Sequence, residues 1–206
     1  MRGPGVRLDL GRPFPLRGGS GEDERVPSYI ALLRAINVGK RQFKMADLRA
    51  CLGASGLSDV ETYIQTGNVR FSTPMRSAAK VERHVEEALA DGCGFQVPAV
   101  ILTPAELRQA YDDALALPPP DFAAEGQRRY VIFFKEQEAP DEEAAAAVKA
   151  WDAPGEYAVA QGRAVHVWLA HASRDATFFG AFKKVLAAGT SRDLKVVKTL
   201  AERWAA

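Results

Sequence analysis

The residues that could do chemistry gather in three short polar segments. The first, residues 34–40, leaves an apolar run and leads into a helical pattern. It contains Arg34, Asn37, Gly39 and Lys40. Such a loop can direct backbone N–H groups and a helix N-terminus at an anion. The alternative is an ordinary strand-to-helix connection in which glycine only supplies a positive φ. A P-loop is excluded, because arginine follows the lysine where Ser or Thr is required.

The second segment is a predicted hairpin. Alternating residues on either side of Thr66 and Gly67 predict two strands joined by a two-residue turn, for which glycine tolerates the positive φ. Gln65 and Asn68 flank that turn. Their amides could bind a base edge, another amide or a sugar hydroxyl. They could equally well hydrogen-bond within their own turn.

The third segment lies near the C-terminus. Thr190 or Ser191 is a natural N-cap for a last helix, predicted from about Arg192 to Trp204. At that position the Arg192 guanidinium and the helix N-terminus could together hold a phosphate or carboxylate. The alternative is simple capping.

Other catalytic and metal chemistries find little support. Two cysteines exclude a disulfide scaffold and a multi-cysteine zinc site. The three histidines lack metal-ligand spacing, and alternation with Val165 and Val167 predicts that His166 faces outward. Neither a Gly-x-Ser-x-Gly elbow nor a Gly-x-Gly-x-x-Gly fingerprint occurs. We therefore expect no metal and no cofactor.

Charge is separated along a nearly neutral chain. The 206 residues carry a formal net charge of +1, which excludes a histone-like or polybasic protein. Bases nevertheless dominate residues 34–49 and 183–206. If these two segments meet in space, they form an anion-attracting face. Otherwise these basic side chains are ordinary solvent-exposed groups on the protein surface.

The helices and strands that must position these segments are predicted to occur in the same order twice along the chain. Residues 28–117 predict the order β-α-β-β-α-β of a split βαβ unit and then a helix. Residues 118–206 repeat the pattern, with a helix in place of the last strand. The prediction is an α+β protein of two fused, related ferredoxin-like (βαββα) subdomains, with helices on one face of each sheet and a C-terminal helix.

The first 27 residues are predicted to be a disordered extension. They are rich in Gly and Pro and contain no apolar stretch of signal-peptide length. We find no run of about 18 apolar residues, so no membrane partner is expected. The expected location is the cytoplasm.

Three strings resemble a known bacterial family. They are Tyr-Ile-Ala-Leu-Leu-Arg-Ala-Ile-Asn-Val-Gly at 29–39, Lys-Met-Ala-Asp-Leu-Arg at 44–49 and Tyr-Ile-Gln-Thr-Gly-Asn-Val-Arg-Phe at 63–71. In this order they are similar to the signature of the family catalogued as domain of unknown function 1697. The resemblance runs from about Ser28 to the C-terminus. It implies an α+β fold and no known reaction.

The chain departs from the family pattern at several positions. Ala35 and Lys40 stand where the opening string has glycine. Thr190 and Arg192 match the family's late signature, which resembles Thr-x-Arg-Asn-Trp-x-Thr, but the Asn, Trp and second Thr are replaced. The resemblance therefore carries over Arg34, Asn37, Gly39, Gln65, Gly67 and Asn68.

The leading functional hypothesis is a ligand-binding protein with a polar anion site. Arg34, Asn37 and Lys40 would meet Gln65 and Asn68 near one end of the first sheet, with Arg192 as a further wall. A nucleotide, a sugar phosphate or single-stranded nucleic acid is the expected partner; the last could stack on exposed sheet aromatics. Two alternatives stay open: an enzyme of unknown reaction class on the same site, and an interaction module in which the motifs only shape turns.

Overall fold

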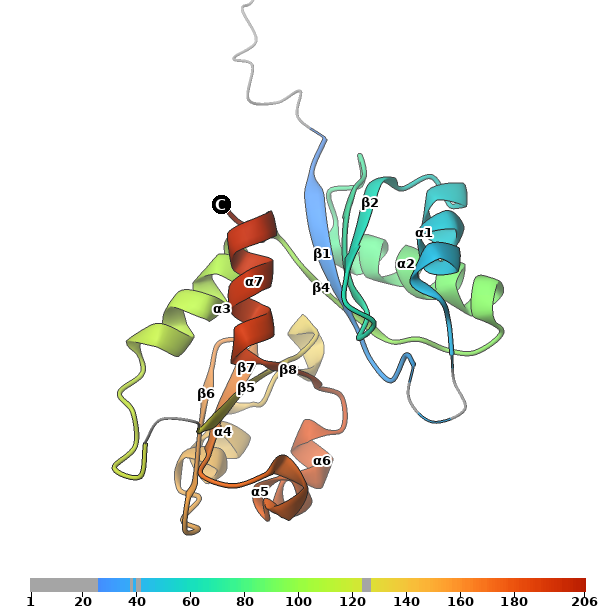
Figure 1. Ribbon diagram of the computed structural model, residues 1–206. Coiled ribbons are helices and arrows are strands. Elements are labelled where there is room, and N and C mark those ends of the chain that lie inside the picture. The colour runs from blue at the N-terminus through green and yellow to red at the C-terminus, as the bar shows by residue number, and fades with distance from the viewer. Residues whose placement is uncertain (1–25, 38, 40–41, 124–126) are drawn as a thin grey trace, which may run out of the picture.

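The described chain folds into two four-stranded antiparallel sheets with helices (Figure 1). The computed structural model describes residues 26–37, 39, 42–123 and 127–206. The predicted α+β class with two related halves and a C-terminal helix is thereby confirmed. The predicted disordered extension lies almost wholly outside the described residues, and a domain boundary at residue 117 stays a prediction. None of the helices described is long and apolar enough to cross a bilayer.

The first half contains a sheet, two helices that cover it and a third helix that leads to the second half. In chain order its elements are β1 (Ser28–Leu33), α1 (Met45–Ala54), β2 (Ser58–Tyr63), β3 (Asn68–Ser72), α2 (Ala78–Cys93), β4 (Ala99–Leu102) and α3 (Pro104–Ala116). Thr103 and Glu106 form the capping box that starts α3.

The second half repeats this order and ends in a helix of its own. Its elements are β5 (Arg128–Phe133), the 3₁₀ turn Glu136–Glu138, α4 (Glu142–Lys149), β6 (Glu156–Gln161), β7 (Ala164–Leu169), the 3₁₀ turn Ser173–Asp175, α5 (Phe178–Ala181), α6 (Lys183–Leu186), β8 (Thr190–Asp193) and α7 (Leu194–Trp204).

The entrance to the last helix differs from the sequence prediction. Thr190 to Asp193 form strand β8, which pairs with β5, so the missing last strand of the second half is present. Because β5 is paired with these residues, α7 begins only afterwards. Its N-cap is Asp193, whose carboxylate accepts from the Lys195 N–H at 2.8 Å, and neither Thr190 nor Ser191 caps it.

The two sheets share one topology. Their strand orders are β2-β3-β1-β4 and β6-β7-β5-β8, and every pairing is antiparallel. Each order places the first and third strand of its half in the centre. The first strand of each half therefore lies between two neighbours, and its C-terminal end meets the connections that carry the predicted site.

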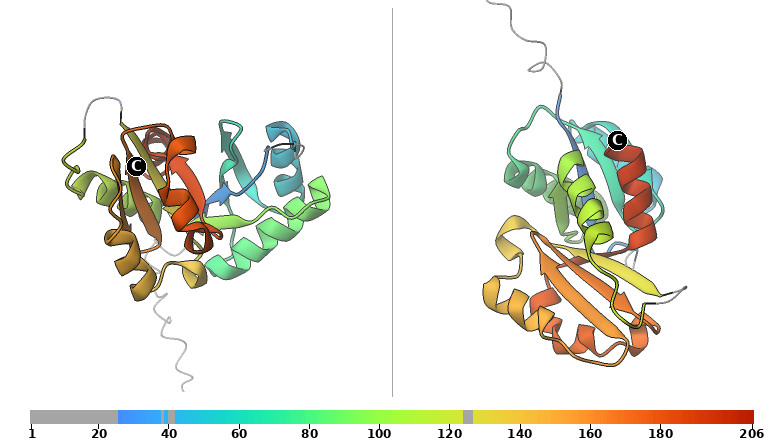
Figure 2. Two further views of the ribbon diagram at one scale, coloured as in Figure 1. Left: turned by 90° about the horizontal axis from the view of Figure 1, so that it is seen from below. Right: turned by 90° about the vertical axis from the view of Figure 1, so that its left-hand side faces the viewer.

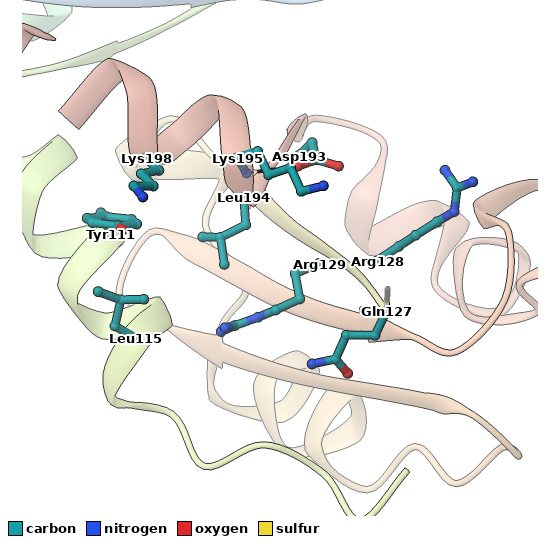
Figure 3. A pocket seen from close by; sticks show the side chains of 9 residues that line it. All are labelled: Tyr111, Leu115, Gln127, Arg128, Arg129, Asp193, Leu194, Lys195 and Lys198. Carbon is teal, nitrogen blue, oxygen red and sulfur yellow. Dashed lines mark hydrogen bonds between the residues drawn. The ribbon is translucent and has the colours of Figure 1, made fainter. Parts of the chain in front are cut away.

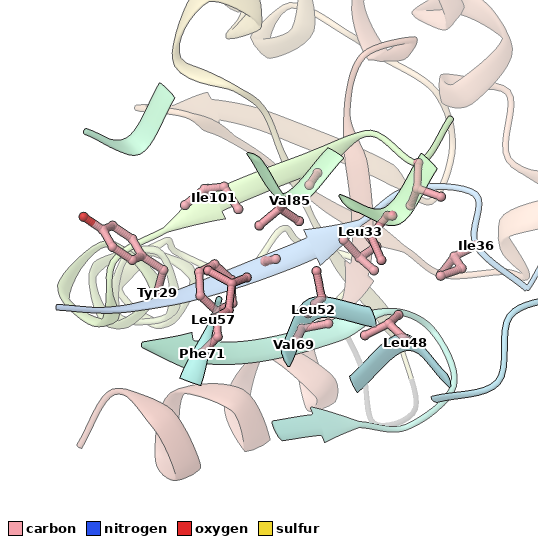
Figure 4. Packing of buried hydrophobic residues seen from close by; sticks show 14 of the residues in the cluster. Tyr29, Leu33, Ile36, Leu48, Leu52, Leu57, Val69, Phe71, Val85 and Ile101 are labelled. Carbon is pink, nitrogen blue, oxygen red and sulfur yellow. The ribbon is translucent and has the colours of Figure 1, made fainter. Parts of the chain in front are cut away.

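The apolar core consists of three layers, of which only the third contains residues of both halves. One lies between the first sheet and α1 and α2 (Figure 4), and a second between the second sheet and α4, α5 and α6. The third packs α3 and α7 with the inner faces of both sheets. Figures 1 and 2 show these two helices side by side. The prediction that helices cover only one face of each sheet was therefore wrong. Each sheet has a second apolar face, and α3 and α7 pack against it.

The first and third layers cover the sheet aromatics on which nucleic acid could stack. Phe71 is fully buried in the first layer. Tyr63 packs against the third layer, with the Arg203 guanidinium 5.3 Å from its ring centre. Neither aromatic is presented as an open platform for bases, in contrast to the mode by which sheet aromatics bind RNA.

The third layer also buries His166, which was predicted to face outward. Its side chain does point away from Val165 and Val167, but it is 1% exposed and neither ring nitrogen has a hydrogen-bond partner within the described chain. Burial lowers its pKa to about 4; the charge of Asp113 opposes this shift and that of Arg129 adds to it.

We predict that His166 makes the protein less stable in acid. Between pH 6.5 and about 4, His166 is protonated in the unfolded state and neutral in the native state. The free energy of unfolding therefore falls as the pH falls. The loss reaches about 3 kcal/mol. Urea unfolding between pH 7 and 4.5 measures it. The variant His166→Leu should show a shallower slope, and parallel curves for the two proteins would contradict the prediction.

Candidate functional site

Several of the predicted residues meet at one cleft between the two halves. The cleft has a volume of about 270 Å³ and lies between the end of β1, the β2–β3 hairpin and β8. It is lined by Leu33, Arg34, Ala35, Ile36, Asn37, Gln65, Thr66, Gly189, Thr190, Ser191 and Arg192. None of these residues is acidic. Lys40 lies outside the described residues.

Arg192 is the buried centre of this cleft. The residue is only 7% exposed. Its guanidinium donates to five oxygen atoms: Asn68 Oδ1 at 2.5 Å, the Ser191 carbonyl at 2.8 Å, and the carbonyls of Leu33, Thr66 and Gly67 at 2.9, 3.0 and 3.2 Å. The side chain therefore fastens β8 of one sheet to the end of β1 and the hairpin of the other.

Among the described residues, the groups that accept hydrogen bonds from the Arg192 guanidinium are all neutral. No ion pair joins it to a carboxylate in the part of the chain described. Burial lowers its pKa to about 10, which still leaves it cationic near neutral pH. Nη1 carries two hydrogens and makes one hydrogen bond, to the Ser191 carbonyl, within the described residues. One N–H of Nη1 therefore has no acceptor among the described residues.

Arg34 adds a second cation. The side chain leaves the end of β1 and donates from Nη1 to the carbonyl of Ala187, just after α6. The two basic segments recognised in the sequence thus meet at this cleft.

The loop after β1 has an unusual backbone. Ala35, Asn37 and Gly39 all have positive φ, of 53°, 56° and 62°. Asn37 holds the loop: its Nδ2 donates to the Gln65 carbonyl at 3.0 Å and its Oδ1 accepts from the Phe43 N–H at 2.7 Å. Its amide therefore ties the loop to the hairpin.

The hairpin loop spans four residues rather than the predicted two. Tyr63 pairs with Asn68, which leaves residues 64–67 in the loop. Gly67 has a φ of 75°, and a Cβ there would lie 2.6 Å from Ile36 Cγ2 and 2.7 Å from Leu33 Cβ. Positive φ and close packing against the β1 loop together require glycine.

The two hairpin amides have different positions. Asn68 is fully buried, and its Nδ2 donates to the Tyr63 carbonyl at 3.1 Å and to Thr66 Oγ1 at 3.0 Å while its oxygen accepts from Arg192. Gln65 is exposed, and its side-chain amide makes no hydrogen bond to the described residues. Only Gln65 is free to contact a ligand directly.

A second and larger cavity was missed by the sequence analysis. It is lined in part by Gln127, Arg128 and Arg129, which precede and begin β5 (Figure 3). Its other basic residues are Lys195 and Lys198 of α7. The signal lay in two adjacent arginines at a strand start, but no sequence pattern brings them to α7.

A comparison with family models matches residues 26–166 to a family described as a protein of unknown function, DUF1697. The chain belongs to this family. The match covers more than half of the chain and ends before β8, so it is shorter than the resemblance drawn from the sequence motifs and does not include Arg192. A search of curated proteins finds no match.

Among solved structures, the chain is similar to the conserved bacterial protein SP0830 from Streptococcus pneumoniae. The two are 23% identical, with a TM-score of 0.66 over 86% of this chain and 98% of the other. At this identity the likeness establishes the shared fold of this DUF1697 member and leaves its ligand open.

We predict that Arg192→Lys severely destabilises the protein. A lysine ammonium cannot span five oxygen atoms on three segments, and the abandoned carbonyls stay buried. The expected loss is about 3 kcal/mol or more in chemical unfolding. Arg174→Lys, at an 86% exposed side chain, is the matched control and should cost almost nothing. If the free energy of unfolding fell by less than the contribution of two ordinary hydrogen bonds, the role of Arg192 as a clamp between β8, the end of β1 and the hairpin would be refuted.

We also predict that Ala35→Gly stabilises the protein. Alanine pays a steric penalty at a φ of 53°, whereas glycine, the family's residue in this position, does not. After the larger backbone entropy of glycine is deducted, the net gain is about 0.5–1 kcal/mol. Ala46→Gly, an exposed position inside α1, should instead be destabilising. Equal effects at both positions would contradict the argument.

Proposed function

We propose that this protein binds a small anionic ligand in the cleft between Arg34 and Arg192. The observation that carries the proposal is the buried Arg192 guanidinium, which faces the cleft without a carboxylate partner in the described chain. A buried charge without a counter-charge is costly, and an anion in the cleft offsets that cost. The setting is the cytoplasm that the sequence analysis expects.

The dimensions of the cleft favour a compact anion. A volume of about 270 Å³ lies just below the usual range of small-molecule sites. It suits inorganic phosphate or the phosphate end of a sugar phosphate. Arg34 would supply a charge-assisted hydrogen bond, the spare Arg192 N–H a second, and the Gln65 amide a contact to a hydroxyl group.

Catalysis at this cleft has weaker support. The described lining contains no histidine, cysteine or carboxylate that could serve as a general base for Thr190 or Ser191. The interaction-module hypothesis explains Gly67 and Asn68, which hold the hairpin, but it does not explain the uncompensated charge. Single-stranded nucleic acid is less favoured than a small ligand, because the sheet aromatics are covered.

The expected result is that Arg34→Gln weakens binding of the anion about tenfold, because one charge-assisted hydrogen bond is lost. Calorimetric titration of the full chain with inorganic phosphate and with ribose 5-phosphate at low salt measures this. At about 100 times its dissociation constant, a ligand should also raise the melting temperature by roughly 5–10 °C.

Arg174→Gln is the matched control, since it removes one exposed arginine far from the cleft lining. Its affinity should stay at the level of the natural chain. The absence of any binding, or equal losses in both variants, would overturn the proposed function. Far-ultraviolet circular dichroism of each variant confirms that the fold is intact before binding is compared.

A further inference from the structure

The larger cavity, here called the basic pocket, has a volume of about 480 Å³. It follows the cleft directly along the chain: Thr190 to Arg192 line the cleft, and Asp193 to Lys195 line the basic pocket. Its walls come from α3, the start of β5 and the first turns of α7 (Figure 3). The lining residues are Tyr111, Leu115, Gln127, Arg128, Arg129, Asp193, Leu194, Lys195 and Lys198.

The charge of the basic pocket is strongly positive. Four of its described lining residues are cationic and one, Asp193, is acidic. The Asp193 carboxylate is engaged in capping α7. Lys195 and Lys198 lie three residues apart on α7, hence on one face of the helix, and both are exposed. The one ion pair of Lys198 within the described chain is a long contact of 3.8 Å to Glu202. Both ammonium groups can therefore turn to an anion.

Arg129 is a rigid cation in the same pocket. Its guanidinium stacks on the ring of Trp168 at 4.5 Å and donates to the Ala114 carbonyl in the last turn of α3. No ion pair to a carboxylate is found for it in the described chain. Figure 3 shows the side chain extending from β5 toward α3. The pocket thus has a preorganised positive charge as well as two mobile ones.

The other side of the pocket is apolar. Tyr111 and Leu115 project from α3, and Leu194 projects from α7 (Figure 3). Leu115 is 56% exposed, so its side chain offers apolar surface to the pocket. Placing the planar ring of a ligand against Tyr111 and Leu115 would remove this apolar surface from water.

Gln127 adds a directional requirement. Its side-chain oxygen Oε1 is buried and has no hydrogen-bond donor among the described residues. A buried carbonyl oxygen of this kind costs free energy until a donor reaches it. A ligand that fits the pocket therefore carries an N–H or O–H group at the end opposite its anionic group.

We propose that the basic pocket binds a nucleoside monophosphate. Lys195 and Lys198 hold the phosphate, the base lies over Tyr111 and Leu115, and a base N–H donates to Gln127. Each of the four common bases carries such a donor. The volume lies within the usual range for small-ligand sites. This site is separate from the cleft and does not depend on the function proposed for it.

The test is calorimetric titration of the full chain with AMP, GMP, CMP and UMP, and with ribose 5-phosphate as the ligand that lacks a base. In the Arg34→Gln variant, where the cleft contributes least to the binding of ribose 5-phosphate, at least one nucleotide should bind about tenfold more tightly than ribose 5-phosphate, since only it covers the apolar wall. The double variant Lys195→Gln/Lys198→Gln should reduce that nucleotide's affinity by about tenfold or more.

Three control variants separate this site from general charge and from the cleft. Lys80→Gln/Lys149→Gln removes two exposed lysines elsewhere and should leave nucleotide affinity unchanged. Arg34→Gln should also leave it unchanged. Gln127→Leu should lower nucleotide affinity while preserving that for ribose 5-phosphate, because only the contact to the base is lost.

Each contrary outcome overturns the assignment. No nucleotide binding, or ribose 5-phosphate binding as tightly as every nucleotide in the Arg34→Gln variant, would remove the role of the apolar wall. Equal losses in the two double-lysine variants would show that only overall charge acts. A loss confined to Arg34→Gln would place the nucleotide in the cleft, which refutes this proposal while leaving the proposed function standing.

Discussion

The buried guanidinium of Arg192 is the interaction on which the arrangement of the two halves depends. It extends from the last strand of the second sheet and holds the end of β1 and the hairpin loop of the first through backbone carbonyls. Those carbonyls can all point at the guanidinium because Gly67 allows the hairpin to lie against the β1 loop. A single planar donor set therefore holds the two halves together at the cleft and determines the shape of the cleft.

Other polar contacts between the halves differ from this clamp in their charge balance. Arg163 binds Glu106 at 2.9 Å as well as the Ile101 carbonyl, and Lys135 contacts Glu82 and Glu86 on α2 at 3.0 and 2.8 Å. Those cations are neutralised within the protein. Because Arg192 has only neutral partners in the described chain, positive potential remains at its end of the joint, where Arg34 adds to it.

Much of the local structure could be predicted from residue pattern. The capping box at Thr103 and the alternation around the hairpin follow from short-range stereochemistry, and the motifs around Arg34, Gln65 and Arg192 were expected near one another. The predictions that were wrong concern residues whose structure depends on segments far away in the chain. Thr190 to Asp193 have the sequence of a helix start but pair with β5 as a strand. His166 alternates like an exposed strand residue but is buried by α3 and α7, which pack over that face of the sheet.

The sequence by itself determined the α+β class, the repeated order of elements, the family and the three polar segments. These depend on periodicity, turn chemistry and motif strings, which involve residues near one another in the chain. Only the tertiary structure decided that Asn68 is engaged within the protein while Gln65 is free, that Arg192 is a clamp, and that Arg129 faces Lys198 across a pocket. Each of these depends on which carbonyls, carboxylates and rings arrive from distant segments, and a guanidinium has the same sequence signature whether its charge is neutralised or left for a ligand.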